Sequence, residues 1–189
     1  ERIMKPFITS IAAAAVVLAL TVFDSTASEK ANSPYAGQEK RQIKSLSAKD
    51  VDDLLNGRGW GLAKAAELNG MPGPAHILEM ADQINLDKDQ NTAIQSMFNK
   101  MKAKAIKIGT KLVQLEKELD LMFANKSITQ KILGIQLDKI AKVRSKLRQV
   151  HLETHLKTPA ILTRHQIVTY NQLRGYTGGA SHSGHSDHQ

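Results

Sequence analysis

The chain contains no cysteine among its 189 residues, and only 4% of its residues are aromatic. The missing cysteine excludes a disulfide, a thiol nucleophile and a lipid-bearing cysteine after an export signal. The scarcity of aromatic residues argues against a base-stacking surface for nucleic acid. No serine, histidine and carboxylate stand at a recognisable catalytic spacing. We therefore predict a protein that is not an enzyme, requires no cofactor and binds no nucleic acid.

Three glycines occupy alternate positions in Gly57-Arg58-Gly59-Trp60-Gly61, a segment that superficially resembles a phosphate-binding loop. No strand is expected before this segment, and no lysine-serine pair follows it, so the pattern of a phosphate loop is incomplete. We interpret the segment as a flexible joint anchored by Trp60.

One long apolar run is present, from Phe7 to Phe23. Basic residues precede it, and Ser25-Thr26-Ala27 follows with small residues at the positions that a signal peptidase reads. This pattern predicts a signal peptide over residues 1–27, cleaved near Ala27, and a periplasmic protein. The alternative is an uncleaved N-terminal anchor in the inner membrane, but the run is at or below the ~20 apolar residues that a span needs.

The rest of the chain divides by composition into three parts. Residues 28–45 are polar, contain Pro34 and Gly37, and show no apolar period, so a disordered leader is expected. Residues 46–176 carry apolar residues at helical spacing. Residues 177–189 are rich in glycine, serine and histidine with no core-forming residue, which predicts a disordered His-rich tail.

Two long apolar stripes dominate residues 46–176. In the first, from Ile94 to Met122, apolar residues recur at alternating steps of four and three, the spacing of a coiled-coil seam. A break follows at 124–127, where Ser127 and Gln130 have the spacing of a capping box, and a second stripe runs to Val150. We predict an all-α fold in which a long antiparallel helical hairpin is braced by short helices. Because such a hairpin leaves apolar surface uncovered, we also predict a homodimer.

A short motif recurs at both ends of the predicted hairpin: a leucine, then an N-cap residue, then a glutamine three positions after the cap. Its residues are Leu86, Asp87, Gln90, Leu162, Thr163 and Gln166. Together with the corner 69–76 and the order of helices over 46–176, this pattern resembles the LTxxQ repeat of the Spy/CpxP superfamily of periplasmic proteins. The first copy departs from the repeat by carrying aspartate in place of threonine. The resemblance implies a thin, dimeric helical cradle and one of two activities. Spy-like members hold unfolding proteins without ATP on a basic, partly apolar face, whereas ZraP-like and CnrX-like relatives bind zinc, nickel or cobalt through histidines.

The first arm of the hairpin carries a row of lysines beside its apolar seam. The candidate client-binding residues on this basic face are Met97, Lys100, Met101, Lys104, Lys107 and Lys111. Lysine attracts acidic or extended chains through long-range charge and offers an apolar stem, and methionine adds adaptable contact area. The alternative is that these lysines are only the solvated face of a coiled coil.

Histidines supply the second candidate site. His151 and His155 lie four residues apart, on one side of the second arm, and could share a divalent ion. A third ligand is expected from His76 or Glu79, because the base of an antiparallel hairpin brings these segments together. This set departs from the CnrX-like pattern, and the alternative is that the histidines only pack locally. The tail residues His182, His185 and His188 could separately chelate Zn, Ni or Cu ions, or form a solvated terminus.

The sequence thus predicts a periplasmic stress protein that holds unfolded or misfolded proteins. The alternative function is binding, sensing or sequestration of a heavy metal such as Zn, Ni, Co or Cu. A membrane-bound sensor partner is compatible with either function.

Overall fold

The structure is a computed structural model that describes residues 33–176. The chain divides into two units, residues 1–36 and 37–189, and every helix within the described residues belongs to the second unit. The predicted signal peptide at 1–27 and the predicted His-rich tail at 177–189 lie outside the described residues. No helix within residues 33–176 is both long enough and apolar enough to cross a membrane.

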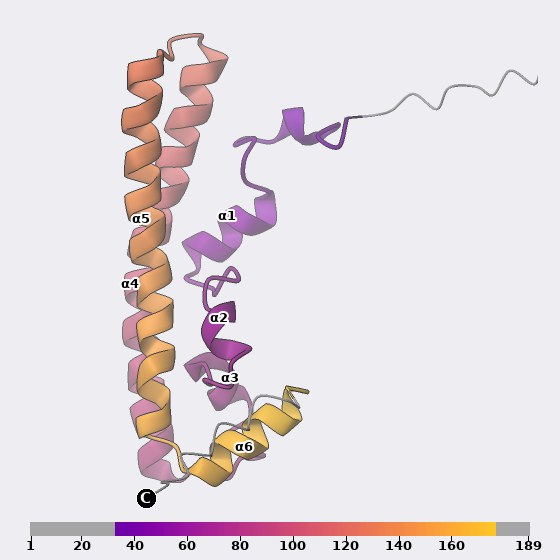
Figure 1. Ribbon diagram of the computed structural model, residues 1–189, viewed down its shortest axis with the longest axis vertical. Coiled ribbons are helices and arrows are strands. Elements are labelled where there is room, and N and C mark those ends of the chain that lie inside the picture. The colour runs from indigo at the N-terminus through magenta and orange to yellow at the C-terminus, as the bar shows by residue number, and fades with distance from the viewer. Residues whose placement is uncertain (1–32, 177–189) are drawn as a thin grey trace, which may run out of the picture. The chain divides into compact units, whose positions relative to one another are not determined.

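A hairpin of two long helices forms the centre of this unit, as the sequence predicts (Figure 1). Helix α4 spans Lys88–Ala124, 37 residues, and helix α5 spans Gln130–Lys157, 28 residues. The two helices pack side by side in antiparallel directions. At a rise of 1.5 Å per residue, α4 is about 55 Å long.

Four short helices and two 3-10 turns complete the described residues, which contain no β-strand. Helices α1 (Ala48–Leu55), α2 (Lys64–Glu67) and α3 (Pro74–Glu79) precede the hairpin, and α6 (Arg164–Leu173) follows it. The 3-10 turns are η1 (Gln38–Lys40) and η2 (Thr158–Ala160). The described residues therefore confirm the prediction of an all-α hairpin with short helices.

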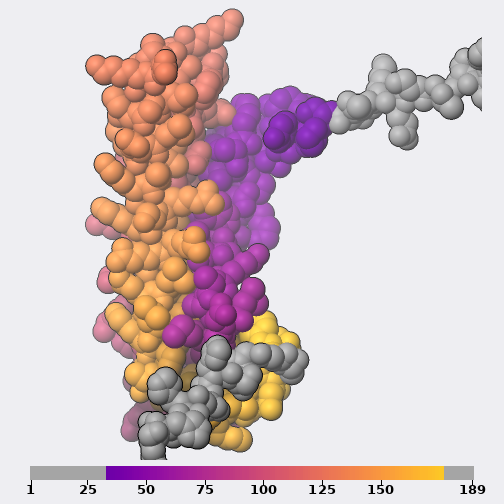
Figure 2. Space-filling view, viewed as in Figure 1, coloured from indigo at the N-terminus to yellow at the C-terminus, as the bar shows by residue number. Residues whose placement is uncertain are grey.

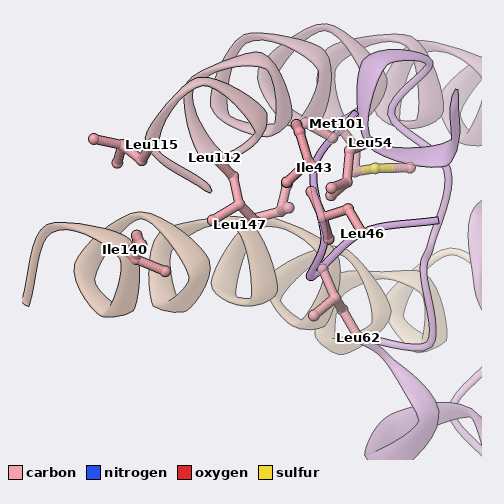
Figure 3. Close-up of a cluster of buried hydrophobic side chains, with 10 residues drawn as sticks. Ile43, Leu46, Leu54, Leu62, Met101, Leu112, Leu115, Ile140 and Leu147 are labelled. Atoms are coloured by element: carbon pink, nitrogen blue, oxygen red, sulfur yellow. The ribbon is translucent and has the colours of Figure 1, made fainter. Parts of the chain in front are cut away.

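The larger core lies where α1 and the segment before it pack on the hairpin (Figure 3). Its buried residues are Ile43, Leu46, Leu54, Leu62, Met101, Ala105, Leu112, Leu115, Ile140 and Leu147. Helices α1 and α4 approach so closely that a Cβ on Gly109 would stand 2.2 Å from the Leu54 carbonyl oxygen. Glycine at this position is what allows the contact.

The core begins earlier than the sequence indicates. Ile43 is 3% exposed and belongs to the larger core, whereas the predicted leader extended to Ser45. A β-bridge between Ile43 and Leu46 turns the chain so that both side chains reach the hairpin. A single apolar residue in a polar segment has no period, so periodicity could not identify it.

The loop between the long helices differs from the prediction in its cap. Thr129, not Ser127, is the N-cap of α5, and its hydroxyl accepts a hydrogen bond from the Ile132 backbone N–H. The Ser127 hydroxyl instead donates to the Met122 carbonyl oxygen, at 3.3 Å. Both residues can cap a helix, and the backbone path of the loop decides between them.

A smaller core at the base of the hairpin joins α3, α4 and α6, and the two predicted capping motifs meet beside it. Gln90 and Gln166 each complete a capping box at the start of their own helix. The Gln90 amide nitrogen also donates to Gln166 Oε1 at 2.9 Å, and the Gln166 amide nitrogen donates to Gln90 Oε1 at 2.8 Å. The repeated motif therefore fastens the two ends of the hairpin to each other as well as capping the helices.

Candidate functional site

The predicted basic face lies on α4, and all four of its lysines are exposed. Lys100 and Lys104, together with Met97 and Met101, line a groove of about 310 Å³ between α4 and α5. We call it the basic groove; its full lining is Ala93, Ser96, Met97, Lys100, Met101, Lys104, Val150, Glu153, Thr154 and Lys157. Three lysines against one glutamate give this groove a positive lining.

The remaining residues of the predicted basic face contribute little or nothing to the lining of the basic groove. Lys107 and Lys111 lie outside the basic groove, and the Lys111 ammonium contacts Gln114 Oε1 at 3.3 Å. Met101 is 8% exposed and belongs mainly to the core, whereas Met97 is half-buried. The adaptable contact area in the groove therefore comes chiefly from Met97.

The part of the hairpin nearest its loop carries large apolar side chains in contact with solvent. These side chains, each between 39% and 55% exposed, are Leu121, Phe123, Ile132, Ile135 and Leu137. We call them the distal apolar residues. In Figure 2 the tip of the hairpin projects beyond the N-terminal segments, which lie along much of the rest of it.

A buried carboxylate organises the opposite, base end of the hairpin. Glu67, the last residue of α2, is 8% exposed. Its Oε1 accepts a hydrogen bond from the Tyr170 hydroxyl at 2.5 Å and lies 3.4 Å from Arg174 Nε. Its Oε2 accepts from the Gly73 backbone N–H at 3.2 Å. One side chain thus ties the end of α2 to the following corner and to α6.

Two of the predicted metal ligands also contact Glu67. His76 Nδ1 lies 3.5 Å from Oε1, and His155 Nδ1 lies 3.7 Å from Oε2. Burial raises the pKa of Glu67, but the contacts with His76 and Tyr170 and the charges of His76 and His155 outweigh it and lower the pKa to about 2. Burial and the same contact with Glu67 raise the pKa of Tyr170. Glu67 is therefore an anion and Tyr170 a hydrogen-bond donor at neutral pH.

The histidines of α5 are both buried, and they differ in their partners. His155 Nδ1 is 2.8 Å from the Met71 carbonyl oxygen, and a carbonyl only accepts, so Nδ1 carries the proton. His151 is 4% exposed, and its Nε2 has no hydrogen-bond partner among the described residues. Burial, with a smaller contribution from His155, lowers the pKa of His151 to about 4. His151 is consequently neutral at physiological pH.

All four predicted folded-site residues, His76, Glu79, His151 and His155, line one cleft of about 760 Å³, which we call the Glu67 cleft. The sequence thus indicated correctly which segments meet at the base of the hairpin. Within residues 33–176, however, no three side chains of histidine, aspartate or glutamate are arranged to hold a metal ion. The tail histidines His182, His185 and His188 lie outside the described residues.

Glu67, Tyr170 and Arg174 are functional-site residues that were not predicted from the sequence. Glu67 stands between Ala66 and Leu68 at the end of a short helix, three positions after Lys64. Besides Gly73 and His76, which are close in the chain, its partners include two tyrosines at separations of 103 for Tyr170 and 109 for Tyr176. The only signal in the sequence is an acidic residue between apolar neighbours, which is too common to single out.

Comparison with protein-family models, with curated proteins and with solved structures finds no match for this chain. The resemblance to the Spy/CpxP superfamily consequently remains a prediction based on the two capping motifs and the order of helices.

Proposed function

We propose that the protein holds unfolded or misfolded proteins in the periplasm, without ATP, on the basic groove of its hairpin. The observation that carries this proposal is the lining of the groove, which combines Lys100, Lys104 and Lys157 with Met97. An open surface that combines positive charge with a flexible apolar side chain suits extended chains of many sequences.

The hairpin geometry supports the proposal in a second way. The groove runs between two long helices, so an extended segment can lie along it without entering a closed pocket. The Spy/CpxP resemblance leads to the same function and to a cradle-shaped dimer. We propose that the distal apolar residues form the contact between the two copies, because they are large, exposed apolar side chains that lie close together near the loop on both arms of the hairpin.

Suppression of aggregation tests the proposed function. A thermally unfolding client should remain soluble at a near-stoichiometric ratio of this protein, and added salt should weaken the effect because the attraction is partly electrostatic. The double variant Lys100→Glu and Lys104→Glu should lose most of the suppression. The matched variant Lys139→Glu and Lys142→Glu makes the same charge change on α5, outside the groove, and should retain it. Absence of suppression by the wild type at every ratio would reject the proposal.

Metal binding is the second candidate function, and one observation favours it. His76, His151 and His155 line the same cleft, although their present contacts leave no three-ligand arrangement among the described residues. Zinc, nickel, cobalt and copper titrations of the full chain should be compared with titrations of two variants. In one, His151 and His155 become alanine; in the other, His182, His185 and His188 become alanine. Loss of binding in the first variant assigns the cleft, loss in the second assigns the tail, and no binding by the wild type rejects metal binding.

A further inference from the structure

The Glu67 cleft has the size and the mixed lining of a small-molecule site. Its volume of about 760 Å³ lies within the range of about 300–1,000 Å³ that is typical for such sites. Apolar surface comes from Trp60, Phe98 and Met101. Two lysines, Lys64 and Lys102, also line the cleft.

The charges of the cleft are not all neutralised within the protein. Arg58 pairs with Asp52 and Asp53, and Arg174 pairs with Glu67. Lys64 and Lys102, in contrast, form no ion pair with any residue from 33 to 176, and Lys102 only lies over the Phe98 ring, 5.8 Å from its centre. Over the same range, Glu79 is the one lining carboxylate outside an ion pair. The unpaired charges therefore favour an anionic ligand.

A polar group in the wall of the cleft also lacks a partner. His151 lines the cleft, is 4% exposed, and has an Nε2 atom with no hydrogen-bond partner among the described residues. A buried polar atom without a partner costs about 1–3 kcal/mol. An oxygen atom of a bound ligand is the kind of partner that would satisfy it.

Trp60 is fixed in place rather than loosely exposed. Its backbone φ is 44°, in the left-handed region, which costs a non-glycine residue about 1–3 kcal/mol and which persists at sites that a structure holds firmly. Its indole Nε1 donates to Asp50 Oδ1 at 2.8 Å, and the Arg144 guanidinium lies 4.9 Å from the ring centre. The glycine-rich joint thus presents a rigid aromatic wall to the cleft.

We propose that the Glu67 cleft binds a small amphipathic organic anion, such as a carboxylate with an aromatic body. Trp60 and Phe98 contact the apolar body, and Lys64 and Lys102 pair with the anionic group. His151, in its neutral form, donates a hydrogen bond from Nε2–H to an oxygen atom of the ligand. This proposal does not rest on the holding of unfolded proteins, which uses the basic groove; the two linings adjoin at Met101.

Fluorescence of the full chain tests the proposal, because Trp60 is the only tryptophan and lines the cleft. The probes are phenylbutyrate and phenylbutanol, which share one apolar body and differ in charge. Phenylbutyrate should change Trp60 fluorescence saturably, and phenylbutanol should bind more weakly. The variant Lys64→Met and Lys102→Met should weaken phenylbutyrate binding about tenfold, as expected for two solvent-accessible charge pairs.

The matched control is Lys117→Met with Lys131→Met, two exposed lysines of the hairpin outside the cleft, which should bind phenylbutyrate as the wild type does. Three results would each overturn the proposal: no saturable response to phenylbutyrate, equal affinity for phenylbutanol, or an equal loss of affinity in the control variant. Because the assay contains no client protein, its outcome is separate from that of the aggregation assay.

Discussion

At the scale of single residues, the base of the hairpin depends on Glu67. This carboxylate accepts hydrogen bonds from Tyr170 and Gly73 and lies beside Arg174, His76 and His155. A buried anion is costly unless it is paired and hydrogen-bonded, and Glu67 is both. Burial opposes these contacts but does not outweigh them, so the carboxylate stabilises the fold while it stays ionised.

The free energy of unfolding should decrease as the pH is lowered, in two separate pH ranges. The pKa of His151 is about 4 in the fold against 6.5 for a free side chain, so the unfolded chain binds more protons and stability falls from pH 6.5 to 4. The loss is about 3 kcal/mol. The pKa of Glu67 is about 2 against 4.5, so its contribution is lost as the pH falls from 4.5 to 2.

Urea denaturation at a series of pH values measures this dependence. The variant His151→Leu should flatten the profile between pH 6.5 and 4 and leave the lower range unchanged. A profile in His151→Leu with the same slope as the wild type would show that His151 does not cause the loss.

At the scale of helices, the contact between α1 and α4 depends on Gly109. A methyl group there would stand 2.2 Å from the Leu54 carbonyl oxygen, so Gly109→Ala should destabilise the protein by about 1–3 kcal/mol. Gly134, in α5, has no heavy atom within 4 Å of its added Cβ. Gly134→Ala should therefore stabilise the protein by about 1 kcal/mol, because alanine favours the helix.

Thermal unfolding of the two variants checks this pair of predictions. Opposite shifts in the unfolding temperature are expected, downward for Gly109→Ala and upward for Gly134→Ala. Equal shifts would mean that helix propensity, rather than the close approach of α1, determines the effect at position 109.

The sequence predicted α4 better than α5, and the packing explains the difference. The apolar stripe of α4 keeps one register, and its residues Ile94, Met101 and Leu112 are buried as expected. In α5, Ile135 and Leu137, which belong to the second apolar stripe of the sequence, are exposed. Their place is taken by Gln136, which is 2% exposed.

Gln136 can be buried because its amide nitrogen donates to the Leu115 carbonyl oxygen on α4, at 3.0 Å. A buried glutamine that finds such a partner cannot be recognised from apolar periodicity. The candidate site was predictable to a similar extent. The sequence located the segments that carry the histidines, because an antiparallel hairpin fixes which ends meet. It contains no sign of the network around Glu67, in which Tyr170 comes from 103 positions later in the chain.

At the scale of the whole molecule, the proposed dimer uses the distal apolar residues as its contact. Light scattering at micromolar concentration should give twice the mass of one chain. Phe123→Lys with Ile135→Lys should give the mass of a single chain, since both side chains are exposed and charge opposes their burial. A monomeric wild type would contradict the proposed dimer.

The central claim is that an unfolded chain occupies the basic groove, and site-specific photo-crosslinking tests it most directly. A benzophenone side chain is placed at Ala93 or Glu153, on the two sides of the groove, or at the exposed Gln172 of α6 as a control. Reduced and carboxymethylated α-lactalbumin, which cannot fold, should crosslink at both groove positions and not at Gln172, and the folded protein should crosslink at none. Equal crosslinking at all three positions, or none in the groove, would contradict the account.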